Sequence, residues 1–447
     1  MDAKQKLSRF DFTMIVVGLV IGMGIFKTAA TAAKASLDPS MFFIAWILGG
    51  FIALCGALTY AEIGSRYPVV GGYFRIFAYA YHPSIAFSIN CIILISNAAS
   101  LSAVALIGSE YINTIFFGAN ASGNTQIYIS IFAILLFYGV NLLGLKVSAR
   151  TQNVLMMIKI LMLLVLISAI FIPSTHYHGK TFEPAAPAQF MDWIKALGVA
   201  LIAVSFTYGG YQQTINFGNE VKTPAKNIPK GIFAGIAIII GLYLLVNYSY
   251  YKTLGFEGLQ NSTEIATLVT TKIFGPTGGK VFSVLLFFSV LAYVNVLLLS
   301  NPRVMYAMSE DGVLPGIFKK KSTKREVFLF SLTTFTALCI IILFYAKTFD
   351  RLLSFTIFLD CFGMATSAGA IFMLRKKTKH LDGTGIYKMK LYPLLPIIFI
   401  LAYSFVGMSI AIKDPMTAIT GIGVLTAFML IYFFTHGIKK RIGETNG

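Results

Sequence analysis

The stretch G-M-G-I-F at residues 22–26 lies in the middle of the first long apolar run of the chain, which extends from residue 12 to residue 33. A run of this length can span a bilayer as a helix, but two glycines separated by one residue weaken the helix near mid-membrane depth. Non-helical backbone is tolerated at that depth only where it lines a cavity. We therefore expect a helix break here, with a binding site at the break. The freed N–H groups and the positive end of the outer half-helix would suit a carboxylate.

The composition indicates a polytopic membrane protein. Hydrophobic residues make up 57% of the chain and charged residues 12%, about half the charged share of a typical soluble domain. The short basic N-terminus precedes an apolar run too long for a signal-peptide core and without a small-residue cleavage site, so we expect this run to be retained. All four cysteines fall inside apolar runs, which argues against a disulfide framework.

Twelve membrane spans are expected from the apolar runs. They cover roughly residues 11–35, 39–63, 83–116, 126–144, 150–172, 192–217, 230–252, 278–308, 327–346, 350–374, 391–412 and 415–436. The Lys and Arg residues concentrate in the N-terminus and the alternate loops that share its side, which predicts that both termini are cytoplasmic in a multi-pass cell-membrane protein. The net charge of +18 then reflects basic flanks facing anionic lipid rather than a nucleic-acid site.

The sixth span repeats the feature of the first. Its apolar run is interrupted by F-T-Y-G-G-Y at residues 206–211, with paired glycines again near mid-depth. Two broken helices five spans apart predict an inverted repeat, because an odd number of spans per unit turns the second unit upside down. We expect one membrane domain with a first repeat at residues 1–172, a second at 192–374, and two peripheral helices within 391–436.

Several motifs together resemble the amino acid/polyamine/organocation superfamily, and within it the L-type amino acid transporter branch. They are G-M-G-I-F at 22–26, Y-A-E-I-G at 60–64 followed by P-V-V-G-G, F-T-Y-G-G-Y at 206–211, N-E-V-K-T-P-A-K-N-I-P at 219–229, and R-V-M-Y-A-M-S-E-D-G-V-L-P at 303–315. The resemblance implies an all-α membrane fold with the five-plus-five inverted repeat of sodium-coupled leucine transporters and two added helices. It also implies alternating-access transport of amino acids.

The resemblance implies a substrate site at the two breaks. Backbone N–H groups of the first break would bind the substrate carboxylate, and backbone carbonyls of the second would bind its amino group, with Phe206 as an aromatic lid. Met23 stands where the family usually has a small or hydroxyl residue. The substrate-binding residues expected in this way are Gly22, Met23, Gly24, Phe206, Tyr208, Gly209 and Gly210.

Lys159 is the expected substitute for a coupling cation. It lies nine residues beyond Arg150 in the fifth span, about 14 Å along a helix, which is too deep for its ammonium to reach water easily. Lys159 matches the lysine of sodium-independent relatives, so we expect it to hold carbonyls freed at Gly22, with Asn295 on the eighth span supplying further acceptors. The alternative is a lysine paired only for helix packing.

Three further charged side chains lie within or at the ends of the expected spans. Lys27 in the first span and Asp360 in the tenth are costly in a membrane unless they are paired or wet. We hypothesise that they attract each other at an outer gate; otherwise Lys27 extends outward and Asp360 bonds local backbone. Glu62 at the inner end of the second span is more often solvated than paired in such a position.

These patterns favour a sodium-independent secondary transporter of neutral amino acids, acting as an exchanger or with protons. A neutral substrate is expected because no acidic side chain falls within the two broken stretches. The alternatives are a transporter of polyamines or cationic amino acids, and a non-transporting sensor. No catalytic, metal or cofactor constellation suggests an enzyme. The loop at 118–124 lacks the cysteine by which animal L-type transporters bind a partner subunit, so a monomer or weak homo-oligomer is expected.

Overall fold

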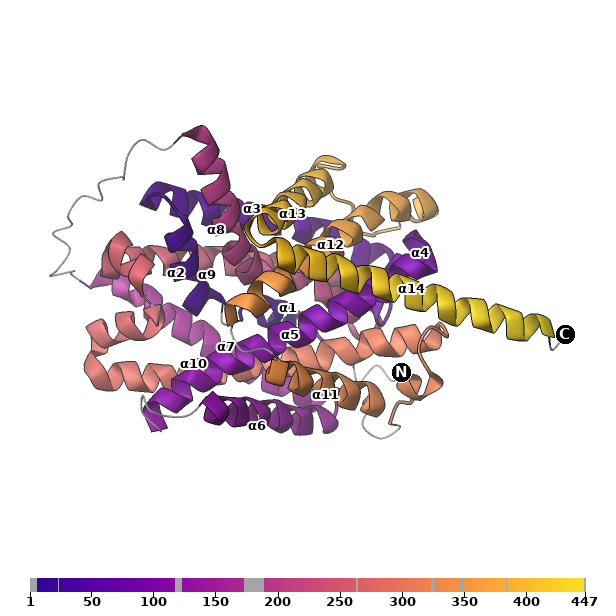
Figure 1. The fold of residues 1–447 in the computed structure, drawn as a ribbon, viewed down its shortest axis with the longest axis horizontal. Helices are drawn as coiled ribbons and strands as arrows, with labels where there is room; N and C mark the ends of the chain where they lie inside the picture. The colour runs from indigo at the N-terminus through magenta and orange to yellow at the C-terminus, as the bar shows by residue number, and fades with distance from the viewer. Residues whose placement is uncertain are drawn as a thin grey trace.

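The first span consists of two helices that meet at the centre of the molecule. In the computed structural model, α1 (Arg9–Val20) and α2 (Gly24–Ala35) are separated by a short non-helical stretch (Figure 1). A capping box between Ser8 and Asp11 begins α1. The predicted break is therefore confirmed. The structure describes residues 6–22, 24–116, 123–172, 189–262, 264–322, 326–345, 349–382 and 384–445, so Met23 lies outside the described residues.

The rest of the described chain is also helical, apart from loops and two isolated β-bridges. The other long helices are α3 (Pro39–Arg66), α5 (Pro83–Phe116), α6 (Gly123–Leu142), α7 (Leu145–Ser168), α8 (Phe190–Tyr208), α9 (Pro224–Asn261), α10 (Ile265–Glu310), α11 (Leu329–Tyr345), α12 (Phe349–Lys377), α13 (Leu394–Lys413) and α14 (Pro415–Thr445). The short helices are α4 (Gly72–Ala80), η2 (Ala169–Phe171), η3 (Tyr211–Asn216), η4 (Gly218–Glu220), η5 (Gly316–Lys319) and η6 (Lys379–Leu381).

These helices account for the twelve expected spans. Within the described residues, 11 helical segments are long and apolar enough to cross a membrane, with α1 and α2 counted as one, and a shorter apolar helix covers Leu329–Phe344. The helices α9 and α10 extend past the expected span ends at residues 252 and 278, because each continues across a kink at a glycine with positive φ, Gly255 and Gly275.

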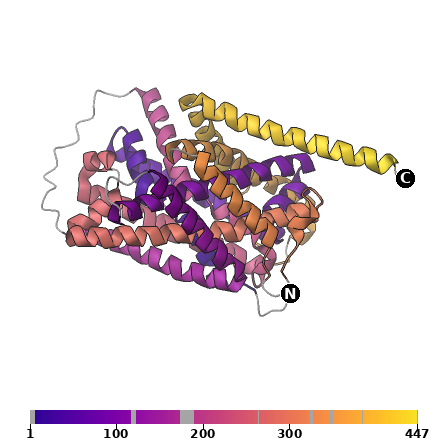
Figure 2. The same ribbon diagram turned by 60° about the horizontal axis from the view of Figure 1, so that its bottom comes forward.

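Burial separates central from peripheral helices. The most apolar window of residues 9–35 is 94% buried inside the protein, whereas that of α14 is 17% buried. Figure 2 shows α14 lying along the outside of the helical body and projecting beyond it. Exposed apolar side chains on such helices face lipid in a membrane, where their exposure carries no penalty. The broken first span thus forms the core around which the others pack.

Candidate substrate site

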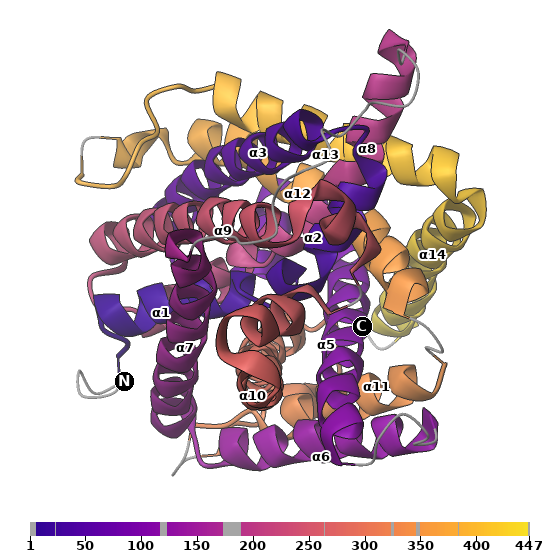
Figure 3. The ribbon, with the colours of Figure 1, turned by 90° about the vertical axis from the view of Figure 1, so that its left-hand side faces the viewer.

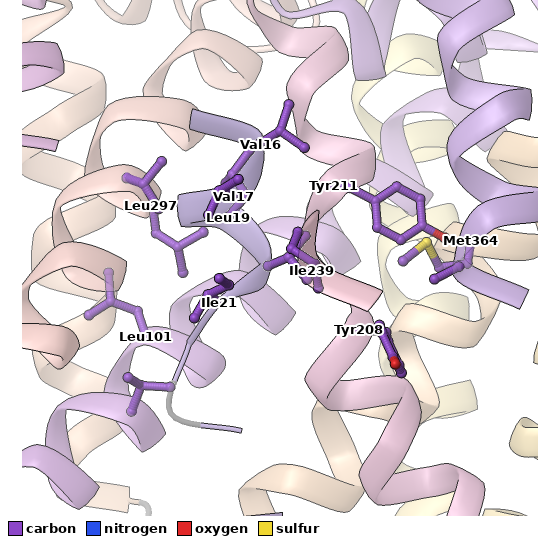
Figure 4. Close-up of a cluster of buried hydrophobic side chains, with 14 of the residues drawn as sticks. Val16, Val17, Leu19, Ile21, Leu101, Tyr208, Tyr211, Ile239, Leu297 and Met364 are labelled. Carbon is purple, nitrogen blue, oxygen red and sulfur yellow. The ribbon is translucent and has the colours of Figure 1, made fainter. Parts of the chain in front are cut away.

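Two buried side chains, Tyr243 and Lys159, donate hydrogen bonds to the backbone at the end of α1. The Val20 carbonyl accepts hydrogen bonds from the Gly22 N–H at 2.7 Å and from the Tyr243 hydroxyl at 3.2 Å. The Lys159 ammonium donates to the Ile21 carbonyl. Figure 4 shows Ile21 where the α1 ribbon ends. These bonds satisfy carbonyls that a continuous helix would have satisfied with its own N–H groups, so the break is stable without water.

The sixth span breaks directly after α8. Gly209 ends the helix, and the chain continues through Gly210 into η3. Gly210 has φ +111°, and a Cβ at this position would lie 2.0 Å from the Leu19 carbonyl oxygen. Only glycine fits such a conformation and such an approach between two backbones. The predicted second break is present, and its glycine pair brings the sixth span against the end of α1.

The two breaks place opposite helix ends side by side. The N-terminus of α2 and the C-terminus of α8 meet where a Cβ on Gly24 would lie 3.0 Å from Thr207 Cα. The hydroxyls of Thr28 and Thr207 are 2.5 Å apart one turn further along α2. Orphan N–H groups at the start of α2 carry partial positive charge, and orphan carbonyls at the end of α8 carry partial negative charge. This pairing is complementary to a zwitterion, with its carboxylate at α2 and its ammonium at α8.

A cavity opens onto these helix ends. Its volume is about 30 Å³, which is room for about two water molecules. Entry of a substrate would therefore require side chains to move. The cavity is lined by Val20, Gly22, Gly24, Asn97, Ser100, Val104, Ser205, Phe206, Thr207, Gly209, Gly210, Gln212, Gln213, Tyr293, Ile357, Asp360, Met364 and Tyr403.

Comparison with known proteins identifies the family. A family model described as "Amino acid permease" matches residues 7–435. The chain belongs to the amino acid permease family. It is 29% identical to the serine/threonine exchanger SteT of Bacillus subtilis, over 98% of each chain. It is 24% identical to the human large neutral amino acids transporter small subunit 2, over 96% of this chain and 80% of that one. It is 22% identical to the mouse Asc-type amino acid transporter 1, over 96% of this chain and 81% of that one.

The structure of this permease brings together most of the substrate-binding residues expected from its sequence. Gly22, Gly24, Phe206, Gly209 and Gly210 all line the cavity. The side chain of Tyr208 instead turns away and packs against Trp46 and Tyr243, with ring centroids 5.8 and 5.1 Å apart. Tyr208 can therefore contribute to the site through its backbone carbonyl, as expected, while its ring braces α8 against α3 and α9.

Polar side chains outside the two breaks also line the cavity. Gln213 donates to Asn97 at 2.7 Å, and Asn97 donates to Asn301 at 2.6 Å. Ser100 and the Tyr293 hydroxyl are 2.8 Å apart. From sequence, small and polar residues of a membrane span are expected to bond neighbouring helices more often than a ligand. They do so here, and those of α5 that line the cavity, Asn97 and Ser100, also face it.

Lys159 and Asn295 make separate connections between the helices around the first break. Lys159 is fully buried and reaches the end of α1 through Ile21 rather than Gly22. Asn295 Oδ1 accepts from Asn141 at 3.0 Å, and its amide nitrogen donates to Gln152 at 2.8 Å. Asn295 therefore ties α10 to α6 and α7, while Lys159 ties α7 to the break.

Lys27 and Asp360 do not form a pair in this conformation. Lys27 Nζ lies 3.0 Å from Glu110 Oε2 on α5. Asp360 Oδ1 accepts from the Ser96 hydroxyl at 2.6 Å, and Asp360 lines the cavity. The sequence did not predict that Asp360 lines the substrate cavity, because the substrate site was expected only at the two spans with a predicted helix break.

Buried ion pairs close the end of the permease at which α1 begins, which is called the inner end below. Glu62 is fully buried, and its Oε1 accepts from Arg66 at 2.7 Å and its Oε2 from Arg375 at 2.7 Å. The expectation that Glu62 is solvated is wrong, because the segment before α13 folds over it and its Met389 N–H donates to Oε2 at 2.8 Å. Arg66 also lowers the pKa of Asp382 by a hydrogen bond at 2.8 Å.

A second set of contacts at this end joins η4 and the loop after it to α10 and to the N-terminal segment. Glu220 forms a two-point ion pair with Arg303, at 2.7 and 3.2 Å. Leu7 pairs with the same loop through backbone bonds to Glu220 at 2.7 Å and Lys222 at 3.0 Å. The inner ends of the first, sixth and eighth spans are thus held together below the cavity.

Proposed function

We propose that this permease moves neutral amino acids across the cell membrane by alternating access, independently of sodium, as an exchanger or with protons. The observation that carries the proposal is the pairing of the α2 N-terminus with the α8 C-terminus at the cavity. Both groups that all α-amino acids share have a complementary helix end there, which a site for a simple cation or anion would not need. Both chain termini are proposed to face the cytoplasm.

The relatives support a neutral substrate. Their names specify serine and threonine, large neutral amino acids, and, in a Bacillus subtilis permease 26% identical over 72% of this chain, branched-chain amino acids. A small neutral side chain agrees with the name of the serine/threonine exchanger, which matches 98% of this chain. We propose a residue such as serine, threonine or alanine as the preferred substrate.

The cationic alternative is favoured by one observation. Asp360 places a carboxylate in the cavity wall, outside the broken stretches on which the expectation of a neutral substrate rested. A buried carboxylate is costly unless it is paired or protonated. The Ser96 hydroxyl provides one hydrogen bond to it, and a cationic side chain could provide a charge.

Counterflow in proteoliposomes tests the proposal. We expect saturable entry of labelled serine into vesicles preloaded with unlabelled serine, unchanged when choline replaces sodium. Excess alanine or threonine should compete more strongly than lysine or arginine. Stronger competition by lysine would support the cationic alternative, strict sodium dependence would contradict the coupling proposal, and binding without flux would indicate a sensor.

The support for sodium independence is the position of Lys159. Its ammonium occupies the end of α1, where a fixed positive charge makes a bound metal cation unnecessary. We propose that the permease acts without a disulfide-linked partner. The loop on which this proposal rests, 118–124, lies mostly outside the described residues.

A further inference from the structure

A second, larger cavity lies at the end of the permease opposite to the start of α1. Its volume is about 420 Å³, within the range of small-molecule sites. Four helices that pack together surround it, namely α2, α8, α12 and α13 (Figure 3). Its lining residues are Thr31, Lys34, Ala35, Val199, Ile202, Ala203, Ser354 and Lys413.

This outer cavity lies in line with the central one. On α8, Ala203 lines the outer cavity and Phe206 the central one. On α12, Ser354 lines the outer cavity and Ile357 lines the central one. A separation of three residues is about one helical turn. The near edge of the outer cavity therefore lies about one helical turn from the substrate site along α8 and α12, and Phe206 and Ile357 line the substrate site at this edge.

The charge of the outer cavity is positive. Lys34 and Lys413 are both exposed, and in the described part of the chain neither forms an ion pair or a hydrogen bond. Among the described residues, the cavity lining contains no acidic side chain. The acids next along the chain serve as helix caps: Asp38 accepts the Met41 N–H at 2.8 Å, and Asp414 accepts from Thr417 at 2.6 Å.

The polar groups of the outer cavity form a donor set. Two ammonium groups, the hydroxyls of Thr31 and Ser354, and the apolar side chains of Val199 and Ile202 line the cavity. Lysines near helix C-termini also stabilise the helix dipole, and this role alone would explain Lys34 and Lys413 as single residues. It does not explain why lysines from two helices distant in sequence line one cavity above the substrate site.

We propose that the outer cavity is a vestibule site in which Lys34 and Lys413 bind the carboxylate of an incoming amino acid before it passes Phe206. The proposal rests on the proposed transport of amino acids and adds a second, weaker site to it. Unpaired ammonium groups raise the local concentration of an anionic group and speed its arrival. The ammonium and side chain of the substrate would remain near Thr31, Ser354 and the apolar side chains of α8.

Entry kinetics from the two faces test this site. The variants are Lys34→Gln, Lys413→Gln and the double variant, in proteoliposomes enriched for one orientation by capture of a C-terminal tag. Lys272→Gln is the matched control, because Lys272 donates to the Thr253 carbonyl at 3.2 Å and lies outside the cavity. Labelled serine entry is measured at low and high salt, with substrate-induced thermal stabilisation as a separate readout of the central site.

We expect the double variant to raise KM for entry from the vestibule face about threefold to tenfold, with little change from the opposite face. We expect KM of the unaltered protein to rise with salt, and this rise should be lost in the double variant. The maximal rate and the stabilisation by saturating serine should remain. Lys34→Arg with Lys413→Arg should restore the KM.

The negative results have different meanings. A double variant with unaltered KM and unaltered salt dependence would overturn the vestibule site alone. A double variant with lowered thermal stability and unaltered KM would also overturn it, and would show that the two lysines stabilise their helices. If the unaltered protein neither transports nor is stabilised by any amino acid, the proposed function and the vestibule site fall together.

Discussion

At the scale of single residues, Gly210 sets the approach of the sixth span to the first. Its positive φ and the nearby Leu19 carbonyl leave no space for a side chain. By contrast, a Cβ on Gly22 would lie 3.4 Å from the Tyr293 ring, which is an ordinary contact. The two glycines therefore have different roles: Gly210 is required by the backbone, and Gly22 keeps the cavity open.

Gly210→Ala should abolish transport and destabilise the protein. The left-handed conformation costs about 1–2 kcal/mol for a residue with a Cβ, and the clash with Leu19 must also be relieved by moving the end of α1. Thermal unfolding of the purified protein and serine counterflow measure the two effects. Gly139→Ala is the control, because no atom lies within 4 Å of its added Cβ. Equal behaviour of the two variants would contradict the assigned role of Gly210.

Lys159→Ala should reduce transport by about tenfold or more. The Ile21 carbonyl would lose its donor in a buried site, at a cost of about 1–3 kcal/mol. Counterflow with choline in place of sodium is the measurement. Lys252→Ala serves as the control, since Lys252 also donates to a backbone carbonyl, that of Ile170 at 2.6 Å, away from the cavity. Transport at the unaltered rate by Lys159→Ala would show that the lysine only packs helices.

At the scale of elements, the inner end of α3 is fastened to α12 and to the segment before α13 by one carboxylate. Glu62 contacts Arg66 within α3, Arg375 on α12 and the Met389 N–H. Its two oxygens thus serve three partners in a site without water access. Because two guanidinium groups share Glu62, its removal leaves positive charges facing each other.

Glu62→Gln should lower the free energy of unfolding by about 3–5 kcal/mol, because breaking a buried ion pair leaves uncompensated charge. The expected result is a lower Tm and a lower yield of monodisperse protein in detergent. Glu310→Gln removes a partly exposed pair with Arg75 and should change stability by about 1 kcal/mol or less. A similar loss in both variants would show that the Glu62 cluster adds no special stability.

At the scale of the whole molecule, the structure shows a closed inner end and a substrate cavity too small for an amino acid. Alternating access requires the inner end to open, since the N-terminal segment is paired with the loop after η4. Leu7 and Val221 form a parallel bridge at this closure. Paired residues of neighbouring strands lie about 5 Å apart, within the span of a disulfide.

Cross-linking Leu7→Cys to Val221→Cys should arrest transport reversibly. We expect an oxidant to stop counterflow by the double variant and a reductant to restore it, because the inner end could then no longer open. Three of the native cysteines are buried and Cys91 is partly buried. The variants that carry only Leu7→Cys or only Val221→Cys should therefore be unaffected by the same treatment. Full transport in the cross-linked state would show that this contact is not part of the gate.

The sequence by itself determined the membrane class, the approximate positions of the spans and the positions of the two breaks. These features depend on local properties: long apolar runs must be helical in a membrane, and glycine pairs such as that at 209–210 weaken a helix wherever they occur. The burial of Lys159 could be predicted for the same reason, since its depth along a helix follows from its distance to Arg150.

Only the tertiary structure decided which side chains from different helices share a site. Asp360 reaches the substrate cavity, Lys27 pairs with Glu110, and Glu62 is covered by the segment around Met389. Each of these outcomes depends on the rotation and tilt of helices that are distant in sequence. Apolar runs in a membrane carry little amphipathic signal to set that rotation, because lipid and protein interior are equally apolar. Packing and the few polar contacts between helices therefore decide it.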